Sequence, residues 1–179
     1  MPNYSYSNLQ IKTSNAAEVR DALNVCDIGS AKILARSDND WVSVYPFLTE
    51  DDFAYLKMVA EKLSARLDVP VFGFIVPNAE EFKYVIYRNG SLLDEFHSQL
   101  KQSDKKHSNT GGNPDVVLPL CKAGTKKQEL KALLRPTAEA APDPKAGDKM
   151  ACQFAELLGI ARVQICTGFN HLKWAQAGR

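Results

Sequence analysis

Residues 53–96 read FAYLKMVAEKLSARLDVPVFGFIVPNAEEFKYVIYRNGSLLDEF, and this stretch decides the fold. Its first part repeats apolar residues at helical spacing, which predicts an amphipathic helix that ends before Pro70. The almost wholly apolar run 71–76 predicts a strand that is covered on both faces. Asn89-Gly90 then predicts a tight hairpin, because both central residues of a type I′ turn need positive φ.

The residues before this stretch predict three strands and a further helix. Asn15 starts a capping-box pattern after a first strand over residues 4–12, so a helix should begin there. Strands over 31–36 and 41–47 follow, and we expect Thr49 to cap the long helix. The resulting order β-α-β-β-α-β-β-β begins with the ferredoxin-like split βαβ motif. We therefore predict an α+β fold, in which a ferredoxin-like βαββαβ sheet is extended by a C-terminal hairpin and followed by a helical segment.

Charge and composition divide the chain into two parts. Residues 1–98 are net acidic and rich in β-branched and aromatic residues, whereas 99–149 are net basic and rich in Lys, Pro, Ala and Gly. We expect a ferredoxin-like α+β domain over 1–98, with a loop and a helical C-terminal part over 99–179 packing on it. In that second part Thr125 and Asp148 are the expected helix caps. The C-terminal tail is ambiguous between strand and helix.

The composition excludes collagen, coiled coils and disordered chains. The 179 residues carry a formal net charge of +1, and 45% of them are hydrophobic, as in ordinary soluble globular proteins. No secretory leader is visible, and no apolar stretch approaches the ~20 residues of a membrane helix, so we expect a cytoplasmic protein without membrane contact. We expect neither a metal nor a cofactor. The four cysteines form no C-x-x-C pair and are expected as reduced thiols: Cys26, Cys121, Cys152 and Cys166.

One face of the predicted sheet should carry aromatic side chains. The two amphipathic helices would cover the opposite face, so the aromatic face is either an open binding surface or is buried by the C-terminal part. We favour burial, because the remaining residues provide enough material to cover it. The glycine turn before Asn113-Pro114 either binds an anion through backbone N–H groups or simply starts a helix. The candidate ligand-binding residues are Trp41, Tyr45, Tyr84, Tyr87, Gly111 and Gly112.

A polar cluster closes the last predicted strand. His97 lies close in sequence to Asp94 and Glu95, which are possible partners for an imidazole base. The candidate catalytic residues are therefore His97 and Asp94, and the alternative is a solvated strand end.

Two strand motifs resemble those of known proteins. Trp41 to Tyr45 reads W-V-x-V-Y, and Tyr84 to Gly90 reads Y-x-x-Y-x-x-G. In these motifs the chain resembles a group of uncharacterised bacterial proteins. The resemblance implies one evolutionary unit of bacterial, cytoplasmic type, and it implies no activity and no catalytic residue.

These observations favour a non-enzymatic binding or regulatory module that recognises a protein partner or a small ligand of unknown identity. Edge-to-edge pairing of two such sheets would give a homodimer. One alternative is an enzyme whose site at His97 is closed by the loop 99–115. Another is weak nucleic-acid binding through lysines between Lys101 and Lys131, which the near-zero net charge argues against.

Overall fold

The elements follow one another along the chain largely as the sequence predicts. The computed structural model describes residues 5–49, 51–98, 100–101, 106–107, 109–135 and 145–172. Within these ranges the strands and helices are β1 (Tyr6–Ile11), α1 (Ala16–Val25), β2 (Ala31–Ala35), β3 (Val42–Pro46), α2 (Phe53–Leu67), β4 (Val71–Asn78), β5 (Glu81–Arg88), β6 (Ser91–His97), β7 (Leu100–Lys101), β8 (Lys106–His107), β9 (Thr110–Gly111), α3 (Pro114–Val117), α4 (Lys127–Leu134), α5 (Ala146–Leu158) and α6 (Arg162–Ile165).

A seven-stranded antiparallel sheet organises the molecule, and the short β7 and β8 pair separately from it. Its seven strands in the described residues lie in the order β2-β3-β1-β4-β5-β6-β9, and every neighbouring pair is antiparallel. The hairpin of β5 and β6 extends the sheet beyond β4, as expected, and the short β9 pairs with the outer side of β6. With the six helices of the same residues, the protein has an α+β fold. None of these helices is long and apolar enough to cross a membrane.

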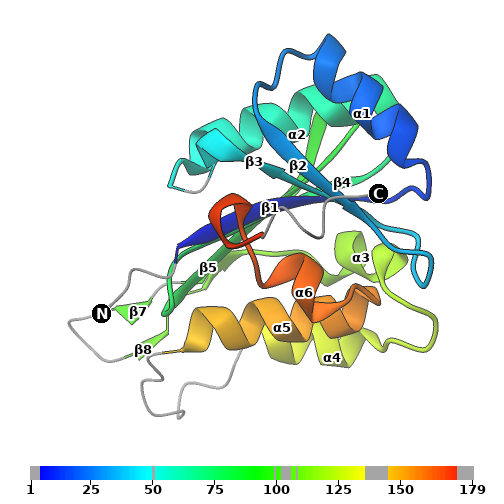
Figure 1. Ribbon diagram of the computed structural model, residues 1–179. Helices are drawn as coiled ribbons and strands as arrows, with labels where there is room; N and C mark the ends of the chain where they lie inside the picture. Colours follow the sequence, from blue (N-terminus) through cyan, green and yellow to red (C-terminus); the bar gives the residue numbers. More distant parts are fainter. Residues whose placement is uncertain are drawn as a thin grey trace.

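Helices cover both faces of the sheet. Figure 1 shows α1 and α2 on one face and the C-terminal helices α3 to α6 on the other. Each face has its own hydrophobic core. In the core between the sheet and the C-terminal helices, the ring centroid of Phe154 of α5 lies 5.2 Å from that of Phe82 and 5.3 Å from that of Tyr84. The C-terminal part therefore buries the aromatic face, which confirms the favoured alternative.

The predicted turn at Asn89-Gly90 and the predicted cap at Asn15 depend on neighbouring residues alone, and the structure contains both. Asn89 and Gly90 have φ of 51° and 72°, as the type I′ hairpin requires, and Arg88 pairs with Ser91 across the turn. The Asn15 side chain accepts a hydrogen bond of 3.1 Å from the backbone N–H of Glu18 at the start of α1. Both predictions are confirmed.

Three predicted caps are wrong, because tertiary contacts occupy their side chains. Thr49 is buried against Ser7, with 2.6 Å between their hydroxyl oxygens, and Asp52 caps α2 instead. The Thr125 hydroxyl donates to a backbone carbonyl of α5, and α4 begins only at Lys127. Asp148 lies within the first turn of α5, where it accepts a hydrogen bond of 3.0 Å from the Tyr6 hydroxyl.

Where the structure describes the ambiguous tail, up to Leu172, it forms α6 and no strand. The backbone carbonyl of Gln164 accepts hydrogen bonds from the Gln10 side chain (3.0 Å) and the Tyr45 hydroxyl (2.8 Å). The side-chain amide of Gln164 donates to the Ser43 hydroxyl (2.9 Å). Asn8 adds hydrogen bonds to two carbonyls at the end of α6. Buried polar groups on the sheet thus find their partners in this helix, which fixes its position on the aromatic side.

Candidate functional site

The aromatic candidates for ligand binding lie in the protein interior. Trp41, Tyr45 and Tyr84 are each at most 1% exposed. The Trp41 indole donates to the Leu158 carbonyl at 3.1 Å, and burial raises the pKa of the Tyr45 and Tyr84 hydroxyls. Tyr87 lies on the opposite face, toward α2, since side chains alternate along β5. These four rings are buried and offer no open surface.

The Gly111-Gly112 turn brings the chain against β6. Its φ angles are 71° and 77°, and a Cβ at Gly111 would lie 1.9 Å from the Glu95 carbonyl oxygen. The Gly112 N–H donates to that same oxygen at 2.9 Å, and the Asn113 N–H donates to the Asp94 carboxylate at 2.7 Å. Both N–H groups are therefore engaged by β6 and do not face a ligand.

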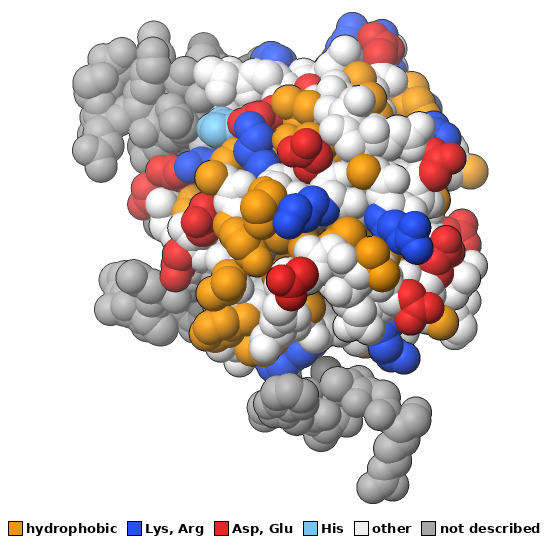
Figure 2. Space-filling model, turned by 90° about the horizontal axis from the view of Figure 1, so that it is seen from above, with side chains coloured by type: hydrophobic (Ala, Val, Ile, Leu, Met, Phe, Trp, Pro, Cys, Tyr) orange, Lys and Arg blue, Asp and Glu red, His pale blue; other side chains and the backbone are white. Residues whose placement is uncertain are grey.

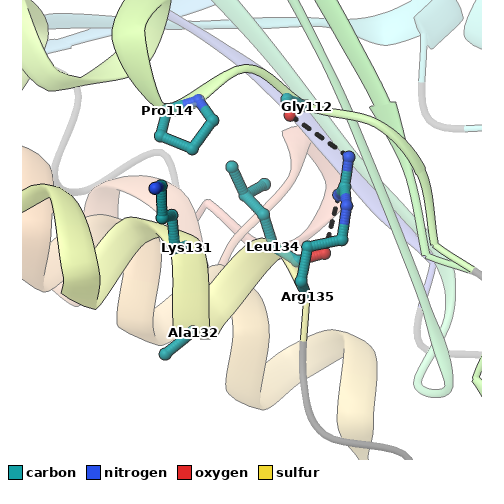
Figure 3. Close-up of a pocket in the computed structure, with 6 residues that line it drawn as sticks. All are labelled: Gly112, Pro114, Lys131, Ala132, Leu134 and Arg135. Carbon is teal, nitrogen blue, oxygen red and sulfur yellow. Dashed lines mark hydrogen bonds between the residues drawn. The ribbon is translucent and has the colours of Figure 1, made fainter.

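A hollow of about 460 Å³ lies between this turn and α4 (Figure 3). In Figure 3, Leu134 points from α4 toward the turn, and Arg135 reaches to the Gly112 carbonyl. The residues that line the hollow are Gly112, Pro114, Lys131, Ala132, Leu134 and Arg135. Its walls combine apolar surface with two cations.

The two cations come from the end of α4. Lys131 lies in its last turn, and Arg135 directly follows its last residue with a non-helical backbone. Arg135 donates to the carbonyls of Gly111 and Gly112, which holds the turn against the helix. Lys131 is exposed and makes no ion pair with the residues that the structure describes.

Asp94 supports the wall of this hollow. Its carboxylate accepts hydrogen bonds from the Tyr84 hydroxyl (2.8 Å) and the Asn113 N–H (2.7 Å). Asn113 in turn caps α3, as the sequence suggests, and Pro114 is the first helical residue. Asp94 therefore connects the sheet to the start of α3.

The structure does not bring His97 and Asp94 together. Side chains alternate along β6, so Asp94 faces the aromatic core, whereas Glu95 and His97 face α2. His97 Nε2 lies 2.9 Å from Glu95 Oε1, and its ring meets Phe53 of α2 edge-on at 5.1 Å between centroids. The observed partner of His97 is thus Glu95, the other carboxylate considered.

Lys57 of α2 completes a small charged cluster with these residues. Its ammonium lies 2.5 Å from Glu95 Oε2, while the other carboxylate oxygen faces His97. Burial opposes ionisation of Glu95, but the hydrogen bonds from Lys57 and His97 outweigh it and lower the pKa of the carboxyl. Glu95 therefore stays charged and orients the imidazole.

The basic segment is only partly described. The side chains of Lys101, Lys105 and Lys106 lie outside the described residues, and Lys127 is paired with Asp115 at 2.5 Å.

Figure 2, which looks onto α1 and α2, shows acidic and basic side chains interspersed over that face. A basic stripe of the kind that follows a phosphate backbone is not visible there.

No family model, curated protein or solved structure matches this chain. Among the described residues, no group of three or more His, Cys, Asp and Glu side chains is placed to hold a metal ion. A function for this chain is therefore inferred from the geometry of the hollow and of the cluster formed by Lys57, Glu95 and His97.

Sequence reasoning considered Lys131 only as a possible nucleic-acid contact and did not consider Arg135. The spacing of Lys131 and Arg135 was visible, but basic residues on a helix are usually just solvated. Lys57 was also visible on the long helix, yet no local signal relates it to Glu95. In both cases only the packing of distant segments assembles the site.

Proposed function

We propose that this chain is a non-enzymatic binding module, and that the hollow beside α4 takes a small amphipathic anion. The ligand would have an apolar body and one carboxylate or phosphate group. The observation that carries the proposal is the pairing of Lys131 and Arg135 beside the apolar side chains of Pro114 and Leu134. An apolar wall with a few placed polar groups is the usual make-up of a small-ligand site.

The expected affinity is modest. Both cations are at the surface, where solvent screens an ion pair to about 1 kcal/mol or less. A ligand of about ten heavy atoms binds such a site with about −4 kcal/mol, which corresponds to a dissociation constant of about 1 mM. The module would therefore serve an abundant metabolite or a group displayed on a larger partner.

Equilibrium binding of benzoate and phenyl phosphate tests the proposal. Replacing Lys131→Ala should weaken binding about twofold to fivefold, because one cation of the site is lost. Lys122→Ala removes an exposed lysine outside the hollow and is the matched control. Benzyl alcohol, which lacks the charge, should bind far more weakly. Equal binding by both variants would exclude Lys131 from the site.

A second candidate is an enzyme that uses His97 as a general base. What supports it is the hydrogen bond from His97 to Glu95, because a carboxylate that orients an imidazole recurs in hydrolytic sites. Hydrolysis of p-nitrophenyl acetate should then fall in His97→Gln and Glu95→Gln and stay unchanged in Lys122→Ala. The same rate in all three variants would remove this candidate.

We also infer that the first half of the chain is a ferredoxin-like unit. What supports this description is the strand run β2-β3-β1-β4 together with the connections through α1 and α2. The expected homodimer remains a prediction, for which β2 is the candidate, as a strand at one edge of the sheet. Light scattering tests it, and a strict monomer at high concentration would contradict it.

A further inference from the structure

Two of the four cysteines lie side by side on the C-terminal helices. Cys152 belongs to α5, and Cys166 follows the last residue of α6 directly. Their Sγ atoms are 3.0 Å apart, and both residues are free thiols of intermediate burial. A disulfide needs about 2.05 Å between the sulfur atoms. A shift of about 1 Å therefore brings the pair to bonding distance.

The surroundings distinguish the two thiols. Burial and the contact with Cys152 raise the pKa of the Cys166 thiol, with the nearby Asp148 carboxylate adding to this. The thiolate is the reactive form, and the raised pKa of Cys166 disfavours it there. Cys152 is thus the better attacking group and Cys166 the second, resolving thiol.

We propose that Cys152 and Cys166 form a reversible disulfide that fastens the α6 segment to α5. The oxidant is a small-molecule disulfide such as glutathione disulfide. The Cys152 thiolate attacks one of its sulfur atoms, so a mixed disulfide forms, the original S–S bond breaks and one glutathione thiolate leaves. Cys166, after losing its proton, attacks Cys152 Sγ and releases the second glutathione thiolate. The protein loses two electrons and two protons, and the small disulfide gains them as two thiols.

The bond would lock a segment that is otherwise held by hydrogen bonds. Gln164 and Ile165 of α6 receive side-chain donors from β1, and Lys32 of β2 donates to the carbonyls of Phe169 and Leu172. Such contacts open and close with local fluctuations. A covalent link between α5 and Cys166 restricts that opening, so oxidation makes this part of the fold more rigid. This inference does not depend on the ligand proposed for the hollow.

Redox titration of the full chain tests the pairing. The protein is equilibrated in glutathione buffers of rising oxidised fraction, free thiols are alkylated, and peptides are identified by mass spectrometry. We expect a peptide linked through Cys152 and Cys166 at oxidised fractions where Cys26 and Cys121 are still alkylated. A Cys26→Ser/Cys121→Ser variant should give the same midpoint. Alkylation of Cys152 and Cys166 at every ratio, or separate glutathione adducts on them, would overturn the proposal.

Hydrogen exchange tests the effect of the disulfide on the segment. In the oxidised protein the amides of residues 162–169 should exchange about ten-fold more slowly than in the reduced protein. Amides of α1 should be unchanged and serve as the internal control. Cys152→Ser should abolish the difference. Identical exchange rates in the oxidised and reduced protein would show that the bond does not fasten the segment.

Discussion

At the scale of single residues, the candidate site depends on how closely Gly111 approaches β6. The position combines a positive φ with a backbone contact that leaves no room for a side chain. Gly124 also has a positive φ, of 89°, but nothing lies within 4 Å of the place that a Cβ would occupy. The two glycines therefore separate the cost of backbone strain from the cost of a steric clash.

Replacing each glycine by alanine should have unequal effects. Gly124→Ala should cost about 1 kcal/mol, because only the left-handed conformation is penalised. Gly111→Ala should cost about 3 kcal/mol or more, because overpacking against Glu95 adds to that penalty. Urea unfolding measures both. Similar losses of stability in the two variants would contradict the observed contact between the glycine turn and β6.

At the scale of elements, Lys57, Glu95 and His97 link α2 to β6. The carboxylate contacts a cation from the helix and an imidazole from its own strand. Because the three side chains are about a quarter to a third exposed, their link is worth no more than about 1 kcal/mol. The stability that this link contributes nevertheless changes with pH in a predictable direction.

The pKa of Glu95 in the folded protein is lower than its ordinary value of 4.5. The folded state therefore binds fewer protons than the unfolded chain, and the added stability is complete above pH 4.5. It is lost as the pH falls through the lower pKa of the folded state. Urea unfolding of wild type and Glu95→Gln between pH 7 and pH 3 should show the stability difference shrinking on acidification. A difference that is constant with pH would contradict this assignment.

At the scale of the whole molecule, one sheet separates two cores, and the C-terminal helices build the second core. This arrangement buries the hydroxyls of Tyr6, Tyr45 and Tyr84. Burial, as the largest cause, raises the pKa of all three above the ordinary value of 10.0. Below pH 10 their contribution to stability is complete, and it is lost as the pH rises through the folded-state pKa values.

Alkaline titration measures this burial. In the tyrosinate absorbance, Tyr6, Tyr45 and Tyr84 should ionise above pH 10 and only as the protein unfolds. The urea-unfolded chain is the control, in which all six tyrosines should titrate together. A folded protein that titrates like the unfolded one would mean that the aromatic face is open.

The predictable features were those encoded by near neighbours. The type I′ turn at Asn89-Gly90 and the apolar stripe of α2 depend on φ preferences and helical spacing, which act locally. Thr49 failed as a cap because a residue distant in sequence, Ser7, engages its hydroxyl. The tail was ambiguous because its helix is positioned by polar side chains of β1 and β3. Contacts across the sheet decide these features, and a single sequence does not reveal them.

The same limit applies to the candidate site. His97 and Glu95 were already neighbours in the sequence, but the contribution of Lys57 required α2 to pack over β6. The glycine turn was visible, whereas its partner α4 was recognisable only as a helix. The sequence thus indicated the glycine turn and the charge of Lys131, but not that the two lie on either side of one hollow with Arg135.

The most direct test of the binding proposal is an amide NMR titration of the isotope-labelled protein with phenyl phosphate. We expect saturable shifts that share one dissociation constant and cluster on Gly112, Lys131 and Arg135. Saturable shifts centred on His97 and Glu95 instead, or no saturable shifts at concentrations well above the millimolar range, would contradict it.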